Sequence, residues 1–210
     1  SLGAVAAAET DSIIVPKLLE AENNKIAQFA GAYVSSRYWN QGWAWVDKIN
    51  MTSWLSSQRA LFLICLPFTA ETWVRTEKFL GESEGIYWSK VIVNPFQSEC
   101  ELHIAIDKLI KYDRPAAAIN CLYKQLHDKQ PLDKTRSVQA LLLAASSNEH
   151  SNDIDAYYIV EIIKALQDDP ATDPDDLFRV EWAYLSILDK YHNASPKLLE
   201  QRRRKTQLSI

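Results

Sequence analysis

The stretch that decides the fold is LHIAIDKLIKYDRPAAAINCLYKQL, residues 102–126. Apolar residues recur in both halves at intervals of three and four, which places them on one face of each of two helices. These residues are Leu102, Ala105, Ile106 and Leu109 in the first half and Ala118, Ile119, Leu122 and Leu126 in the second. Pro115 separates the halves, because proline disfavours helix at Arg114 and suits the first turn of the next helix. The stretch therefore predicts a pair of amphipathic helices joined by a tight connection.

Further helix starts follow downstream. Asp133 caps one helix, Asn152 or Asp153 caps another, and Asp173-Pro174 gives the strongest start in the chain. The first members of successive pairs begin near Glu99, Lys134 and Pro174, at spacings of about 35 and 40 residues, within the range of helical-repeat arrays. One amphipathic hairpin cannot bury its apolar face alone, so we expect consecutive hairpins to stack.

Upstream, the pattern is less regular but still helical. The expected helices run from Asp11 or Ser12 to Ala30, from Ser36 to Ile49, from Thr52 or Ser53 to Pro67, from Thr69 to Gly81, and from Ser83 to Trp88. Gly31 is expected to end or kink the first of these helices. Residues 90–93 are the one place where an extended segment is an alternative.

Composition excludes several classes of protein. With 47% hydrophobic and 24% charged residues among 210, the chain is globular. Five glycines supply few of the tight turns that hairpin sheets need, and three cysteines argue against a disulfide framework and for a reducing compartment. The longest apolar run, Ala60–Phe68, is too short to cross a membrane. The net charge is −4 although Arg202–Lys205 are all basic, so nucleic-acid binding through that run is an alternative that the totals disfavour.

These observations predict an all-α protein of about ten helices, stacked as antiparallel hairpins in a short right-handed α-α superhelix. We expect an aromatic-rich helical part over residues 1–97 and a helical-repeat part over residues 98–210, unless the two form one continuous domain. The chain does not begin with methionine and contains only Met51, so we expect a fragment of a larger protein.

The segment Ala105–Leu126 resembles a tetratricopeptide- or HEAT-like hairpin, with small residues such as Ala117 and Ala118 where two helices approach closely. It departs from the tetratricopeptide pattern in having no glycine in the turn. Residues 107–126 and 157–199 also resemble segments of large uncharacterised bacterial multidomain proteins. The resemblance implies a helical-repeat fold and a bacterial source, and it implies no activity.

Catalytic and metal-binding signals are weak. Cys100 and His103 are three apart, which puts two possible metal ligands on one helix face, but further ligands would have to come from Cys121 or His127. The acidic loop 167–176 fails as a calcium loop, because Pro174 stands where glycine is required. The sequence carries no nucleotide-binding or hydrolase motif, so we expect no enzyme, metal or cofactor.

The remaining candidates are surface residues. Trp39, Trp43 and Trp45 cannot all point inward, since positions 43 and 45 differ by about 200° around a helix; Trp43 is the candidate here. On the second helices of the hairpins, the apolar stripes leave a set of polar and aromatic residues exposed. These are Asn120, Lys124, Tyr157, Tyr158, Glu161 and Lys164.

The sequence thus predicts a non-catalytic, cytoplasmic protein-interaction or scaffolding module that binds a protein partner or other domains of the same polypeptide. The alternative is a regulatory or catalytic helical domain with an acidic pocket between its two halves.

Overall fold

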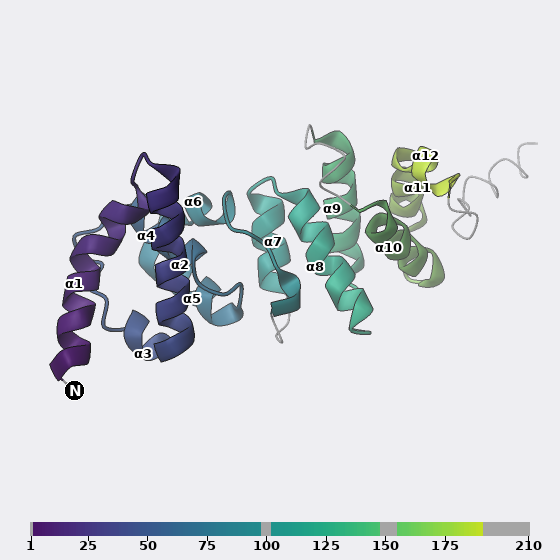
Figure 1. Ribbon diagram of the computed structural model, residues 1–210. Helices are drawn as coiled ribbons and strands as arrows, with labels where there is room; N and C mark the ends of the chain where they lie inside the picture. The colour runs from purple at the N-terminus through teal and green to yellow at the C-terminus, as the bar shows by residue number, and fades with distance from the viewer. Residues whose placement is uncertain (1, 98–101, 148–154, 191–210) are drawn as a thin grey trace, which may run out of the picture. The chain divides into compact units, whose positions relative to one another are not determined.

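The computed structural model describes residues 2–97, 102–147 and 155–190 (Figure 1). Within these ranges the chain forms helices α1 to α12 and two short 3-10 segments, and it contains no strand. The all-α prediction is therefore confirmed for the described residues, and the right-handed superhelix stays a prediction. The chain divides into two compact units, Ser1–Cys100 (unit 1) and Glu101–Ile210 (unit 2); the sequence placed this boundary between residues 97 and 98.

Unit 1 is built on two long helices, α1 (Leu2–Leu19) and α2 (Asn24–Gln41), which pack against each other. The shorter elements are α3 (Trp43–Val46), α4 (Ser56–Ile64), α5 (Ala70–Leu80), η1 (Gly81–Glu84), α6 (Gly85–Trp88) and η2 (Pro95–Gln97). Helix α4 packs on α1, α5 and α6. Its Phe62 is buried between the rings of Trp45 and Trp54, with ring centroids 5.7 and 5.5 Å away. Large aromatic side chains therefore fill the core of this unit.

The helix boundaries at the start of the chain differ from those predicted. The predicted helix from Asp11 or Ser12 to Ala30 is wrong, because α1 ends at Leu19 and α2 begins at Asn24. Asn23 caps α2 by accepting a hydrogen bond from the Lys25 N–H at 3.0 Å, and this cap was missed. The predicted end or kink at Gly31 is also wrong. Gly31 lies inside α2, and a Cβ atom added to it would be 3.6 Å from the Cys65 sulfur.

The second predicted helix, Ser36–Ile49, is interrupted in the structure. Gly42 adopts a φ of 61°, which favours glycine, and this residue ends α2 and begins the single turn α3. The predicted stop at Gly81 is confirmed, since Gly81 has a φ of 50° at the end of α5. Residues 90–93 are neither helix nor strand, so the alternative of a strand there is not realised.

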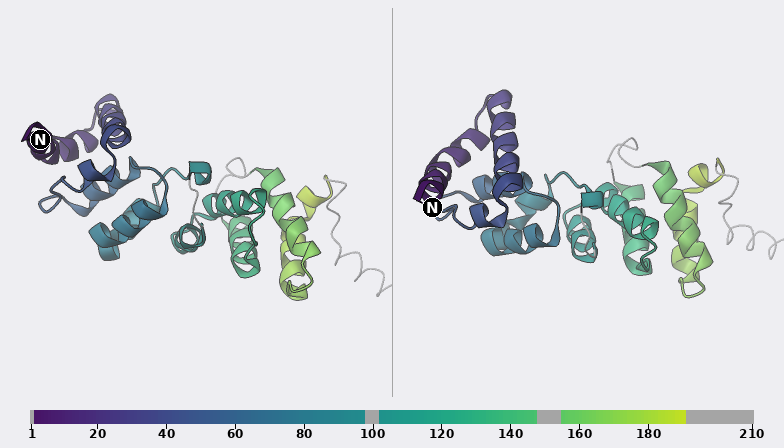
Figure 2. Two further views of the ribbon diagram at one scale, coloured as in Figure 1. Left: turned by 90° about the horizontal axis from the view of Figure 1, so that it is seen from below. Right: turned by 60° about the horizontal axis from the view of Figure 1, so that its bottom comes forward.

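Unit 2 contains six helices within its described residues: α7 (His103–Lys111), α8 (Pro115–His127), α9 (Lys134–Ser146), α10 (Ala156–Asp168), α11 (Pro174–Ala183) and α12 (Leu185–Leu188). Helix α8 packs against α7, α9 and α10, and α9 packs against α7 and α11 (Figure 1). Helices α10 and α11 also pack together, and they lie side by side in both views of Figure 2. Helices α8, α9 and α10 thus contact neighbours both earlier and later in the chain.

Local signals in the sequence account for where these helices begin. Pro115 is the first residue of α8, and Asp133 caps α9 by accepting from the Arg136 N–H at 2.9 Å. Asp173 caps α11 by accepting from two N–H groups, those of Asp175 and Asp176. The cap of α10 is Asp155; the predicted caps Asn152 and Asp153 lie outside the described residues.

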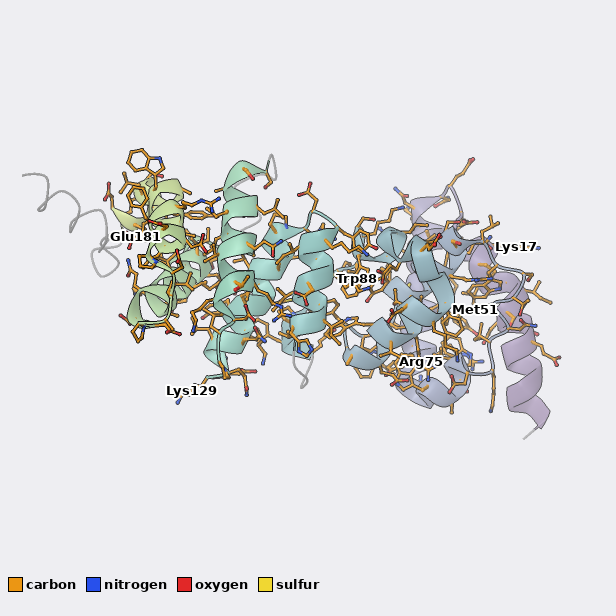
Figure 3. The ribbon with its side chains drawn as sticks, turned by 180° about the vertical axis from the view of Figure 1, so that it is seen from behind. Lys17, Met51, Arg75, Trp88, Lys129 and Glu181 are labelled. Carbon is orange, nitrogen blue, oxygen red and sulfur yellow. The ribbon has the colours of Figure 1, made fainter. Side chains whose placement is uncertain are left out.

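The tight connection between α7 and α8 is made without glycine. Asp113 adopts a φ of 55°, and the N–H groups of Asp113 and Arg114 donate to the carbonyls of Ile110 and Leu109. Lys129, labelled in Figure 3, has a φ of 58° just after α8. The N–H groups of Lys129 and Gln130 donate to the carbonyls of Leu126 and Gln125. Both helices therefore end in a Schellman motif with a non-glycine residue in the left-handed position, which explains how the turn forms without the tetratricopeptide glycine.

Candidate protein-interaction surface

The rings of three tyrosines from two helices meet on one face of unit 2. Tyr123 of α8 and Tyr158 of α10 are stacked, with ring centroids 3.8 Å apart and an angle of 8° between the planes. Tyr157 stands at 70° to Tyr123, with ring centroids 5.8 Å apart. Tyr157 is 46% exposed, while Tyr123 and Tyr158 are half-buried. We call Tyr123, Tyr157 and Tyr158 the tyrosine surface.

The helical pattern explains why these rings are accessible. In α10 the apolar residues Ile159, Val160, Ile162, Ile163 and Leu166 are buried and hold the helix against the rest of unit 2. Tyr157, Glu161 and Lys164 recur at intervals of four and three, which places them on another face of the helix. None of these three residues is buried. The packing of α8 on α10 brings Tyr123 to the same face.

Charged side chains next to the tyrosine surface are paired along their own helices. The Lys164 ammonium donates to Glu161 Oε1 at 2.8 Å, and the Lys124 ammonium pairs with Asp128 Oδ2. The His127 ring Nδ1 lies 3.2 Å from Asp128 Oδ1, and the His127 ring centroid is 6.3 Å from that of Tyr123. The ion pairs beside the tyrosine surface therefore join residues four positions apart on α8 and three positions apart on α10.

The surroundings of Tyr123 raise the pKa of its phenol. Desolvation raises the pKa of Tyr123, and a hydrogen bond with Tyr157 together with the charges of nearby groups, including Glu161, raises it further. The phenol is protonated at neutral pH, as an ordinary tyrosine is, and the raised pKa extends this range to higher pH. On α10, Glu161 lies one helical turn after Tyr157 and Tyr158, so its carboxylate is on the same side of the helix as these rings.

The structure brings together five of the seven residues that the sequence proposed. Lys124, Tyr157, Tyr158, Glu161 and Lys164 all belong to the tyrosine surface or to the ion pairs beside it. Asn120 lies on α8, four residues before Lys124, and is half-buried. Sequence reasoning missed Tyr123, although its spacing of three from Asn120 and four from His127 puts it on the same helix face.

Trp43, the seventh candidate, belongs to unit 1. The guanidinium of Arg75, labelled in Figure 3, lies 4.3 Å from the centroid of the Trp43 ring, and the Tyr38 ring centroid is 5.0 Å away. Trp43 is half-buried and Trp45 is buried, whereas Trp39 is 71% exposed. The requirement that one of the three tryptophans face outward is met by Trp39, and Trp43 is covered by Arg75.

No cluster of three or more His, Cys, Asp or Glu side chains suited to a metal ion occurs among the described residues. Cys100 lies outside them. Cys121 is fully buried, and burial raises the pKa of its thiol above the ordinary range. Burial likewise raises the pKa of Cys65 to about 11, so both thiols are protonated and poorly nucleophilic at neutral pH. In the described part of the chain, no helix is both long and apolar enough for a membrane span.

Comparison of the chain with family models, curated proteins and solved structures finds no match.

Proposed function

We propose that this chain is a non-catalytic protein-interaction or scaffolding module, which binds a protein partner or another domain of the same polypeptide through the tyrosine surface. The observation that carries the proposal is the stacked Tyr123–Tyr158 pair with Tyr157 standing across it. Tyrosine is enriched among the residues that dominate binding energy in protein interfaces. Three such rings, accessible on one face, are therefore a suitable anchor.

The arrangement supports binding because the rings are held before a partner arrives. Tyr123 and Tyr158 come from helices that are neighbours in space but are separated in sequence by all of α9. Their stacking limits the rotation of both side chains, so less conformational entropy is lost on binding. The ion pairs of Lys124 and Lys164 lie on the same two helices as the rings and add polar groups to this surface, and protein interfaces combine aromatic and polar groups in this way.

The packing order in unit 2 supports a repeat-like scaffold as part of the same proposal. First helices α7, α9 and α11 contact one another in sequence, as do second helices α8, α10 and α12, and this is the order expected of stacked hairpins. The cytoplasmic location and bacterial source belong to the proposal too, the former on the evidence of cysteine usage. The alternative of an acidic pocket between the two halves stays a prediction.

The proposal is tested by affinity capture with single-residue variants. The full chain is immobilised, proteins are captured from an extract of the source cells, and the captured amounts are measured by quantitative mass spectrometry. Tyr157→Ala is expected to weaken capture of the specific partner about tenfold, since truncating an interface tyrosine of this kind costs about 1–2 kcal/mol. Circular dichroism of the variant is expected to be unchanged, because the Tyr157 side chain is 46% exposed.

Trp39→Ala is the matched control, because it removes an even more exposed aromatic side chain from unit 1. Capture by this variant is expected to equal that of the unaltered chain. Equal capture by the Tyr157→Ala variant would overturn the proposal, and a loss confined to Trp39→Ala would move the binding surface to unit 1.

A further inference from the structure

We propose that the tyrosine surface binds an arginine side chain in a basic segment of the partner protein, with the guanidinium stacked on an open tyrosine ring face and hydrogen-bonded to Glu161. The inference rests on the proposed function and specifies which chemical group of the partner is bound. It follows from three observations: an exposed tyrosine ring one helical turn from a carboxylate, the way the same chain holds its own arginines, and the charge of unit 2.

The ring faces of the tyrosine surface hold no cation from the described part of the chain. The described cation–π contacts involve other rings, namely those of Tyr33, Trp43, Trp45, Phe79 and Tyr112. Tyr157 stands steeply across the stacked pair, at 62° to Tyr158 and 70° to Tyr123. Tyr157 is 46% exposed and lies one helical turn before Glu161 on α10. An exposed ring near a carboxylate is a combination that attracts a cation.

Unit 1 uses this combination twice for its own arginines. The Arg37 guanidinium lies 5.8 and 5.6 Å from the ring centroids of Tyr33 and Trp45 and donates to Asp11 Oδ2 at 2.7 Å. The Arg75 guanidinium lies over Trp43 and donates to Glu71 Oε1 at 2.8 Å. In both places a ring face and a carboxylate hold one guanidinium. The tyrosine surface presents the same two groups, an exposed tyrosine ring and a carboxylate one helical turn away.

Charge complementarity favours a basic segment. The described residues of unit 2 include thirteen Asp and Glu against ten Lys and Arg. Glu161 is the acidic residue on the same side of α10 as the tyrosines, and Asp155 caps the start of that helix. The net negative charge of the described residues of unit 2 therefore increases the association rate of a basic partner and disfavours acidic competitors.

Arginine fits better than lysine because of its shape and hydration. A guanidinium is planar, stacks on aromatic rings and is less strongly hydrated than an ammonium. The Lys164–Glu161 pair does not block the site, since about a third of each side chain is exposed and ion pairs at the surface are weak. Glu161 can accept from an incoming guanidinium while Lys164 turns to solvent.

The test measures binding of short fluorescent peptides to the full chain by fluorescence anisotropy. In the first peptide arginine alternates with serine; in the others citrulline, lysine or glutamate replaces arginine. Citrulline keeps the planar shape of arginine and removes its charge. We expect the arginine peptide to bind at least about tenfold more tightly than the citrulline peptide and about threefold more tightly than the lysine peptide.

Two variants locate the binding. Tyr157→Ala and Glu161→Gln are each expected to weaken binding of the arginine peptide about fivefold. Asp189→Asn is the control for net charge, because it removes one negative charge from an exposed position just after α12, and it is expected to change the affinity less than about twofold. Tyr157→Phe, which keeps the ring, is expected to bind like the unaltered chain.

Four results would overturn the inference: equal binding of the arginine and citrulline peptides, tighter binding of the glutamate peptide, no effect of Tyr157→Ala on peptide binding, or equal losses for Glu161→Gln and Asp189→Asn. The capture experiment separates this failure from failure of the proposed function. If Tyr157→Ala removes a captured partner but the arginine peptide does not bind, the tyrosine surface stands and its ligand is not an arginine. If Tyr157→Ala changes neither measurement, both proposals fail.

Discussion

Asp11 is a heavily bonded side chain in the core of unit 1. It is 6% exposed and accepts hydrogen bonds from Tyr33 Oη at 2.7 Å, Arg37 Nη2 at 2.7 Å and Trp45 Nε1 at 3.0 Å. These donors tie α1 to α2 and α3. Burial alone would raise the pKa of Asp11, but the hydrogen bonds and the charge of Arg37 outweigh it and hold the pKa below its ordinary value.

The lowered pKa makes stability depend on pH in a definite direction. The unfolded chain takes up a proton on Asp11 near pH ~4, before the folded chain does, so this stabilisation is present above about pH 4 and is lost as the pH falls further. Asp11→Asn is expected to lower the free energy of unfolding at neutral pH by about 2–4 kcal/mol, since it leaves Arg37 poorly paired. It should also flatten the decline in stability below about pH 4.

Urea unfolding at a series of pH values checks this prediction. Glu82→Gln is the control, because Glu82 is exposed, and its curve should run parallel to that of the unaltered chain. An Asp11→Asn curve that also runs parallel would show that Asp11 is not the group responsible.

The role of Asp11 could not be predicted from the sequence. The pattern placed Asp11 at the start of a helix, whereas it lies inside α1. Its donors are 22, 26 and 34 residues away, and no spacing rule connects positions so far apart. Tyr123, by contrast, could have been predicted, because intervals of three and four along α8 place it on the same helix face as Asn120 and His127.

Among the elements, α1 shows how a proline is tolerated inside a helix. Pro16 has no N–H to donate to the carbonyl of Ser12, four residues earlier. The indole Nε1 of Trp54 donates to that carbonyl instead, at 2.8 Å. Trp54 is buried and its ring packs against Phe62, so the tertiary structure supplies the hydrogen bond that the helix lacks.

A double-mutant cycle measures this compensation. Trp54→Phe is expected to lower the free energy of unfolding by about 1–3 kcal/mol beyond the effect of lost packing, because the Ser12 carbonyl loses its donor. In a Pro16→Ala background, the substituted alanine supplies an N–H and the extra cost should fall by about 1 kcal/mol or more. The packing loss is common to both backgrounds and cancels. Urea unfolding of the four proteins gives the coupling energy, and a value near zero would contradict the account.

Helix ends were predictable where the signal is local. The starts of α8, α9 and α11 follow from Pro115, Asp133 and Asp173, whose caps and fixed dihedrals act within one turn. The break between α1 and α2 has no proline or glycine, so it was missed. Gly31 suggested an end or kink, but it lies inside α2, where a Cβ would be 3.6 Å from the Cys65 sulfur.

For the whole molecule, amphipathic spacing was enough to predict the fold class and the candidate surface. The stripes of α8 and α10 identified which face is buried, and the residues left over on the other face include most of the tyrosine surface. Spacing alone could not show that Tyr123 and Tyr158 are stacked, because the pairing of α8 with α10 depends on the packing of the intervening α9.

The distribution of tryptophan provides a test of the entire burial pattern. Of the seven tryptophans, Trp39 and Trp182 are 71% and 63% exposed, while Trp45, Trp54, Trp73 and Trp88 are buried. Iodide is a hydrated anion that cannot enter an apolar core, so it should quench mainly the two exposed indoles. A Trp39→Phe/Trp182→Phe variant is expected to lose most of the iodide-quenchable fluorescence and to emit at shorter wavelength.

Trp45→Phe serves as the control for this measurement, because it removes a buried indole and should leave the iodide-quenchable component in place. The half-buried Trp43, under the Arg75 guanidinium, accounts for the residual quenching expected in the double variant. If the double variant were quenched as strongly as the unaltered chain, indoles assigned to the core would have to be accessible, and the amphipathic packing that positions the tyrosine surface would be wrong as well.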